Sequence, residues 1–210
     1  KCKSPAEGDL IRGRDPVILA KALEAAGAPV ISVVTEKDHY GGSIQLLLEI
    51  SKSVKVPVLR KDFIKSEEDL RISIDNGASS VLLISSIMTK ECLINLIDCS
   101  LTLGIEPLVE THTEEELNLV KDMGLTFVGI NNKDINRWEM DDGTVNTIEN
   151  FTTVIPDGTL IVSESSISST RDIKRAVQAG AQCVLVGTAI LKADDSVEVY
   201  QRFSKIKKQV

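Results

Sequence analysis

Short apolar runs alternate along this chain with segments of helical period, and this alternation limits the folds that the chain can adopt. The apolar runs cover residues 29–35, 57–62, 80–85, 106–111, 126–131, 160–165 and 183–188. A strand followed by a helix about every 25 residues predicts parallel strands joined by right-handed crossovers. Because the runs are almost continuously apolar, both faces of the predicted sheet should be buried. The pattern therefore predicts an α/β fold.

The segments between these runs carry the end signals of helices. They open on Asp, Ser or Thr and close near a glycine, which are the residues that usually cap helices. Four such segments span 15–28, 66–78, 113–124 and 169–181. Ser66 with Asp69, and Thr113 with Glu116, have the spacing of capping boxes, in which the cap and the third helical residue exchange hydrogen bonds.

The number of strands selects one α/β architecture. Seven strands suit an open doubly wound sheet poorly, because that fold usually has about five or six, whereas a closed (β/α)8 barrel needs eight. We expect the eighth at the N-terminus, where residues 1–5, KCKSP, have the pattern of the last turn of strand one and the following loop, ahead of a helix at 14–27. The prediction is a single TIM-barrel domain over residues 1–210, truncated at the N-terminus so that its first strand is short or missing.

Charge and composition exclude several classes of function. The net charge is -7 at pH 7 and the pI is about 5.0, so we expect no nucleic-acid partner and no membrane partner. The longest apolar run, residues 78–88, is too short to span a bilayer. The chain has four cysteines without metal-ligand or disulfide spacing, which predicts free thiols in a reducing cytoplasm. They are Cys2, Cys92, Cys99 and Cys183.

Polar residues gather at the carboxyl ends of the predicted strands, where TIM barrels keep their active sites. They are Lys61, Asp62, Glu110, Asn131, Glu164, Ser165, Gly187 and Thr188. Residues two apart in a strand share a face. If Leu59 and Leu108 point into the barrel, Lys61 and Glu110 point to the same side. Both charged side chains should point into the barrel mouth, as should Asn131.

A lysine and a glutamate that face each other can act as general acid and general base, and the alternative is a structural ion pair. At the seventh barrel strand, alternation lets only one of Glu164 and Ser165 point inward, and the sequence leaves that choice open. The loop after that strand and the VGTA segment that contains Gly187 and Thr188 lie where these barrels commonly hold phosphate.

These segments resemble the indole-3-glycerol phosphate synthase family. The resemblance runs through KCKSP, SVVTEKDHYGGS, PVLRKDFI, EPLVETH, FVGINNKD, SESSIS and VLVGTAIL, in this order along nearly the whole chain. It implies a (β/α)8 barrel that converts 1-(2-carboxyphenylamino)-1-deoxyribulose 5-phosphate into indole-3-glycerol phosphate with loss of carbon dioxide and water. It also implies a cytoplasmic enzyme of tryptophan biosynthesis that uses no metal or organic cofactor, and we expect a monomer.

The resemblance assigns roles to individual residues. Lys61 matches the proton donor, Glu110 the general base, and Lys1 the lysine that contacts the substrate carboxylate. Glu164 matches a further active-site carboxylate, while Asn131 and Ser165 match groups that orient substrate. The matches to the phosphate site are Ser4, Ser166, Gly187 and Thr188. The matches to the pocket for the aromatic ring are Tyr40, Phe63, Leu82, Lys133, Ile135 and Leu185.

The chain departs from the family pattern at three positions. The family has a glutamate two residues before the position of Lys1, and the sequence has no counterpart. Ser166 stands where the family has glycine, which lets phosphate approach the backbone closely. Lys133 stands where arginine is usual, so the charge is kept but a bidentate fork is lost.

Two other functions remain open at this stage. One is a barrel enzyme similar to phosphoribosylanthranilate isomerase, which would pair a cysteine of strand one with an aspartate of strand six. Cys2 could supply the cysteine, but strand six ends in Asn131 instead of an aspartate, and asparagine is a poor base. The other is a related protein that binds a phosphorylated ligand without turnover.

Overall fold

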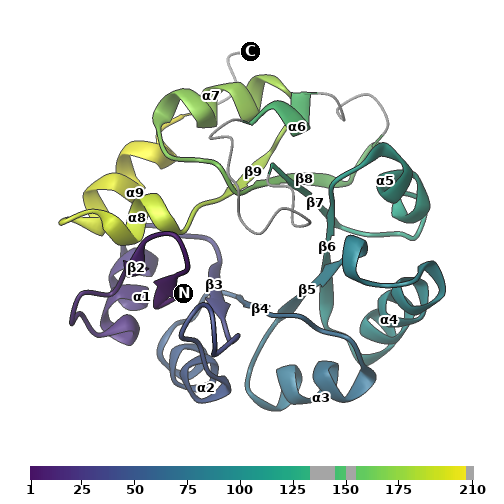
Figure 1. Ribbon diagram of the computed structural model, residues 1–210, viewed down its shortest axis with the longest axis horizontal. Coiled ribbons are helices and arrows are strands. Elements are labelled where there is room, and N and C mark those ends of the chain that lie inside the picture. The colour runs from purple at the N-terminus through teal and green to yellow at the C-terminus, as the bar shows by residue number, and fades with distance from the viewer. Residues whose placement is uncertain (133–144, 150–154, 207–210) are drawn as a thin grey trace.

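The structure is a computed structural model that describes residues 1–132, 145–149 and 155–206. Parallel strands form a curled sheet of seven, with helices outside it (Figure 1). Each strand pairs with the next along the chain, so the sheet follows sequence order. The strands are β3 Ile31–Val34, β4 Val58–Lys61, β5 Ser80–Ile84, β6 Glu106–Thr111, β7 Phe127–Asn131, β8 Leu160–Glu164 and β9 Cys183–Leu185. This is the arrangement of a TIM barrel that lacks one strand, as the sequence predicts.

The N-terminal residues do not add to this sheet. Residues Lys3–Ser4 (β1) instead pair antiparallel with Gly8–Asp9 (β2) in a small hairpin. This agrees with the prediction that the first barrel strand is short or missing, and the hairpin at Lys3 and Ser4 is a feature that the sequence did not predict. The backbone N–H groups of Cys2 and Lys3 both donate to the carbonyl of Tyr40, which anchors the hairpin beside the loop after β3. Among the strands that the structure describes, β3 and β9 are left as the two edges.

Helices cover the outside of the sheet and begin at the expected caps. Asp15 caps α1, and at α3 Ser66 and Asp69 form the predicted capping box. At α5 only half of the predicted box forms: Thr113 Oγ1 accepts from the N–H of Glu116, but the Glu116 carboxylate accepts from the N–H of His112. The helices are α1 Pro16–Ala25, α2 Ile44–Ser53, α3 Glu67–Asp75, η1 Ser85–Ile87, α4 Lys90–Leu103, α5 Glu114–Val120, α6 Asn146–Glu149, α7 Thr170–Gln178, α8 Thr188–Lys192 and α9 Ser196–Ser204.

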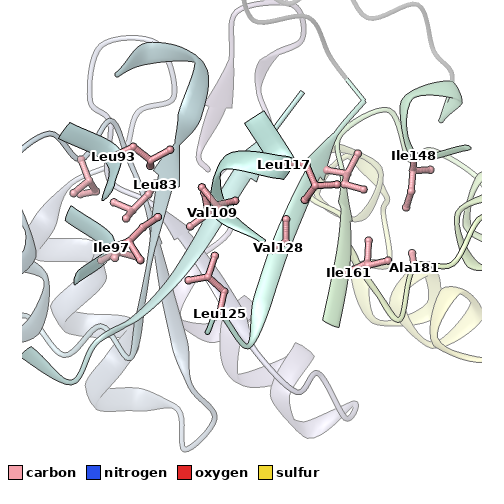
Figure 2. Close-up of a cluster of buried hydrophobic side chains, with 14 of the residues drawn as sticks. Leu83, Leu93, Ile97, Val109, Leu117, Leu125, Val128, Ile148, Ile161 and Ala181 are labelled. Atoms are coloured by element: carbon pink, nitrogen blue, oxygen red, sulfur yellow. The ribbon is translucent and has the colours of Figure 1, made fainter. Parts of the chain in front are cut away.

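The sheet buries apolar side chains on both faces, as its sequence predicts. Figure 2 shows the outer layer, where side chains of neighbouring strands such as Val109 and Val128 pack with Leu117 of α5. A separate inner cluster fills the concave face and is formed by Leu59, Leu82, Ile84, Leu108 and Val162. The inner cluster forms the floor on which the polar residues at the carboxyl ends of the strands rest.

No helix in the described ranges is long and apolar enough to cross a membrane.

Candidate active site

A buried cluster of one lysine and two glutamates lies at the carboxyl ends of three strands. Lys61 ends β4, Glu110 lies in β6 and Glu164 ends β8. The Lys61 Nζ atom lies 3.1 Å from Glu110 Oε2 and 3.3 Å from Glu164 Oε2. Both carboxylate side chains are 1% exposed, whereas the lysine is 28% exposed. One ammonium group thus contacts two buried carboxylates, and of the three side chains only the lysine reaches solvent.

Strand alternation explains why these side chains meet. Leu59 and Leu108 belong to the inner cluster, so Lys61 and Glu110, two residues further along their strands, point to the same side. Glu110 lies in register with Ile84 on one neighbouring strand and with Gly129 on the other. The charged cluster therefore lies one layer above the leucines of the inner cluster.

Gly129 provides the space that Glu164 occupies. A Cβ atom at position 129 would lie 2.3 Å from Glu164 Oε1, well inside van der Waals contact. No hydrogen-bond partner is found for this oxygen among the described residues. The close approach of Glu164 to the β7 backbone therefore requires glycine at this position.

Two asparagines at the end of β7 hold the Glu110 carboxylate and the backbone at the end of β8. The Asn131 amide donates to Glu110 Oε1 over 2.9 Å. The Asn132 side chain reaches β8, where it donates to the Glu164 carbonyl over 2.9 Å and lies 3.0 Å from Ser163 Oγ. Asn132 carries no prediction from the sequence. Its position directly after a strand-end asparagine is the only signal that could have identified it.

The electrostatics of the cluster distinguish the two glutamates. Burial raises the pKa of Glu164 to about 7, and the neighbouring Glu110 raises it too, against the opposing effect of Lys61. Burial acts in the same direction on Glu110, but Lys61, the Asn131 amide and His112 together lower the pKa of Glu110 below its usual value. The two carboxylates raise the pKa of Lys61 although its own burial lowers it. Near neutral pH the site therefore holds an ammonium, an ionised Glu110 and a Glu164 that is partly protonated.

The turn after β8 determines which of Glu164 and Ser165 points inward. Glu164 points into the cluster, while the next two residues, Ser165 and Ser166, have φ angles of +64° and +54°. This left-handed backbone reverses the chain directly after the strand. Ser166 is buried, and it takes a conformation that glycine adopts more easily.

The N-terminal segment lies between the loops that follow β3 and β9. The Lys1 Nζ atom lies 5.6 Å from the centre of the Tyr40 ring. The Lys1 Cε atom is 3.7 Å from where a Cβ of Gly187 would stand. Gly187 caps α8, which Thr188 begins. Ser4 is buried within the hairpin. The structure thus brings Lys1 to the loops after β3 and β9.

The predicted pocket for the aromatic ring is placed only in part. Leu82 lies in register with Leu108, one layer below Glu110, and is 1% exposed; Ile84 is the apolar residue at the level of the charges. Leu185 packs against the inner cluster, and Phe63 is 45% exposed just after β4. The remaining two positions, Lys133 and Ile135, lie outside the described residues.

The described ranges contain no group of three or more His, Cys, Asp or Glu side chains arranged to hold a metal ion. The thiols of Cys2, Cys92, Cys99 and Cys183 are free. Asn131, which stands where an isomerase would have its aspartate, donates its amide to Glu110 and has no carboxylate to act as a base. The chemistry of the cluster is that of proton transfer by lysine and carboxylate groups.

Comparisons with known proteins identify the family of the chain. The sequence model of the indole-3-glycerol phosphate synthase family matches residues 1–203. The indole-3-glycerol phosphate synthase of Pyrococcus furiosus is 43% identical over 203 residues, which are 97% of this chain and 88% of that protein. That of Thermococcus kodakarensis is 40% identical over 206 residues, covering 98% and 90%.

A solved structure supports the fold independently. The chain matches a protein in the crystal structure of the Amycolatopsis orientalis BexX/CysO complex with a TM-score of 0.66, over 95% of this chain and 91% of the other. At 18% identity this likeness concerns the fold alone. The match of the family model over residues 1–203 and the identity of 43% to a relative show the family. The chain belongs to the indole-3-glycerol phosphate synthase family, the carboxy-lyases of tryptophan biosynthesis.

Proposed function

We propose that this chain converts 1-(2-carboxyphenylamino)-1-deoxyribulose 5-phosphate into indole-3-glycerol phosphate, with Lys61 as proton donor and Glu110 as general base. The observation that carries the proposal is the buried contact of one lysine with two glutamates whose pKa values are shifted in opposite directions. Pairs of titratable groups whose surroundings shift their pKa values in opposite directions are typical of acids and bases in enzymes.

The reaction requires protons at defined atoms. The ring carbon that bears the carboxylate bonds to the ketone carbon of the sugar chain, and the ketone oxygen takes up a proton. Carbon dioxide then leaves, and its bonding electrons restore the aromatic ring. Finally the new hydroxyl takes up a proton and leaves as water, while the methylene carbon beside the nitrogen loses a proton. Two protons are taken up and one is released, so the site needs a donor and a base.

Lys61 suits the donor role because its ammonium is the exposed member of the cluster. The same positive charge attracts the substrate carboxylate in the ground state. Because Glu110 and Glu164 raise its pKa, Lys61 gives up a proton reluctantly. Glu164, whose pKa is about 7, lies within hydrogen-bond distance and can return a proton to Lys61 after each transfer.

Glu110 suits the role of base because it is ionised and held in place. Lys61 and Asn131 each donate to a different oxygen of its carboxylate. These contacts hold the carboxylate in one orientation, which lowers the entropic cost of reaching a reactive geometry. Asn131 and Ser165 then orient the substrate from the ends of neighbouring strands.

The rest of the substrate would bind at both sides of the cluster. Ser4, Ser166, Gly187 and Thr188 form the proposed phosphate site, where backbone N–H groups and hydroxyls can donate to phosphate oxygens. The aromatic ring would lie against Tyr40, Phe63, Leu82 and Leu185, and Lys1 would contact the substrate carboxylate. The resemblance adds Lys133 and Ile135 to the ring pocket, and both lie outside the described residues. Binding of these remote groups would hold the reacting atoms near Lys61.

Fluorescence of the indole product provides the test. Lys61→Ala and Glu110→Gln should each reduce kcat by roughly a thousandfold or more, since each removes a proton-transfer group. Lys65→Ala, which removes an exposed lysine four residues along the chain, is the matched control and should keep full activity.

Circular dichroism must show that all variants fold. Full activity in Lys61→Ala and Glu110→Gln would refute their roles as proton donor and base. A folded wild-type protein that binds the substrate without turnover would favour the alternative of a ligand-binding protein. Turnover of phosphoribosylanthranilate by the wild type would favour the isomerase alternative instead.

A further inference from the structure

His112 lies between two carboxylates and takes no part in the proposed chemistry. Its Nε2 atom is 3.6 Å from Glu110 Oε1, and its Nδ1 atom is 3.6 Å from Glu116 Oε2. The side chain is only 13% exposed, and neither ring nitrogen makes a hydrogen bond to a described residue. Both nitrogens lie a few tenths of an ångström beyond hydrogen-bond distance from a carboxylate oxygen.

Only one charge state of the ring suits these surroundings. A neutral imidazole carries a lone pair on one nitrogen, and that lone pair would face a carboxylate oxygen. The imidazolium carries N–H groups on both nitrogens, so each carboxylate faces a donor. Glu116 and Glu110 accordingly raise the pKa of His112, although burial lowers it.

Glu116 is itself held in this place by the loop around it. Its Oε2 atom accepts from the N–H of His112 over 2.6 Å and lies 2.7 Å from the Ser85 hydroxyl. The same hydroxyl lies 2.8 Å from the carbonyl oxygen of Glu110. Glu116 would close a capping box if it reached the N–H of Thr113, and it reaches one residue further back instead. Its carboxylate is thereby directed toward the histidine.

We infer that His112 is a positioning residue for Glu110, and that Glu116 holds His112 in position. This inference rests on the proposed function, in which Glu110 is the general base. The groups that face His112 among the described residues are Glu110 of β6, Glu116 of α5 and Glu164 of β8, and Lys61 of β4 contacts the far oxygen of Glu110. Lys61 thus contacts one oxygen of the Glu110 carboxylate, while the Asn131 amide and His112 lie at the other oxygen.

The first test measures Glu110 without any substrate. In protein labelled with 13C at the glutamate side-chain carboxyl carbons, the Glu110 signal is assigned by its absence in Glu110→Gln. We expect the titration midpoint of Glu110 to rise by about one pH unit in His112→Gln, because a positive charge at this distance is removed. Glu116→Gln should raise it less, since the histidine stays but loses the anion that favours its charged form.

Glu115→Gln removes an exposed carboxylate from the same helix and is the matched control, which should leave the midpoint unchanged. In the double variant His112→Gln/Glu116→Gln the midpoint should equal that of His112→Gln, because Glu116 acts through the histidine. An unchanged midpoint in His112→Gln, or an equal shift in Glu115→Gln, would overturn the inference. If His112→Gln does not fold, the comparison of Glu116→Gln with Glu115→Gln decides in the same way.

Turnover separates this inference from the proposed function. We expect kcat of His112→Gln to fall by roughly tenfold with KM unchanged, because the base is misoriented while the binding groups remain. A wild-type protein without turnover would refute the proposed function and leave the titration result standing. A normal kcat in His112→Gln, in an enzyme that is otherwise active, would refute the positioning role alone.

Discussion

Gly129 matters through the side chain that it lacks. Glu164 Oε1 occupies the space beside the Gly129 Cα atom and would lie 2.3 Å from an added Cβ atom. Glu164 is fully buried and tied to Lys61, so it has little freedom to withdraw. A single methyl group at this position would therefore act on the charge distribution of the whole cluster.

Gly129→Ala should lower the free energy of unfolding by about 1–3 kcal/mol, since it overpacks a buried contact, and reduce turnover because Glu164 must move. A double-mutant cycle with Glu164→Ala isolates the cause. In the Glu164→Ala background the same substitution should cost much less stability, because the clashing oxygen is gone. An equal cost in both backgrounds would show that the alanine collides with something else, such as the Glu110 backbone.

Ser166 adopts a backbone conformation that favours glycine, with φ of +54°. Ser166→Gly should raise the free energy of unfolding by about 1 kcal/mol, because the left-handed conformation costs a serine more than a glycine. Urea denaturation measures this change. If the side chain also narrows the proposed phosphate site, KM for the phosphorylated substrate should fall in the same variant. Lower stability together with a higher KM would mean that the hydroxyl contributes more than the backbone strain costs.

At the scale of single residues, period-two alternation predicted the direction of Lys61, Glu110 and Asn131 correctly. It could not decide between Glu164 and Ser165, because the positive φ angles that reverse the chain there belong to residues without a sequence signature. The same alternation continues from Glu110 to His112 and could have identified the histidine. The capping-box spacing predicted only half of the contacts at Glu116, whose carboxylate accepts from the N–H of His112 and from the Ser85 hydroxyl, 31 residues away in the sequence.

Arg60 joins three elements behind Lys61, the proposed proton donor. Its guanidinium lies on the outer side of β4, is buried, and donates to Thr35 Oγ1 after β3. It also donates to the Asp69 carbonyl and to Ser73 Oγ in α3. A second terminal nitrogen lies 3.0 Å from Asp62 Oδ2. These contacts fix the carboxyl end of β4, from which Lys61 points the other way.

Arg60→Met should lower the free energy of unfolding by about 3 kcal/mol, because it removes the charge that pairs with Asp62 and the donor to the hydroxyl groups of Thr35 and Ser73. Arg71→Met is the matched control. Arg71 forms an exposed pair with Glu67 in the same helix, so its loss should change stability by less than about 1 kcal/mol. Chemical denaturation compares the two variants, and a similar small cost for both would contradict the structural role of Arg60.

At the scale of elements, the order of strands and the capped starts of α1, α3 and α7 followed from local sequence signals. Arg60 carried no prediction, since an arginine within an apolar strand has no local signal for the helix and strand that it will join. The hairpin of β1 and β2 also went unpredicted. Its two-residue strands are too short to show a period, and its anchor, the Tyr40 carbonyl, belongs to a distant loop.

The stability of the whole molecule should depend on the protonation of Glu164. Its pKa is about 7 in the folded protein against an ordinary value of 4.5. A raised folded-state pKa contributes stability that is fully present below pH 4.5 and is lost as pH rises through about 7. The contribution is on the order of 3 kcal/mol, since each pKa unit corresponds to about 1.4 kcal/mol.

Glu164→Gln should therefore gain stability relative to the wild type as pH rises from about 5 to 8. Glu115→Gln, whose side chain is exposed, should follow the wild type over the same range. Urea midpoints recorded at several pH values provide the comparison. A constant difference between Glu164→Gln and the wild type would show that Glu164 has the same pKa in the folded and unfolded states.

The strand order of the sheet has a kinetic consequence. Each strand from β3 to β9 pairs with the next strand along the chain, so no pairing among the described strands joins segments that are far apart in the sequence. Loops between neighbouring segments cost less entropy to close than long ones, and contacts that are local in sequence favour fast folding. The sheet can therefore grow by adding one neighbouring strand at a time.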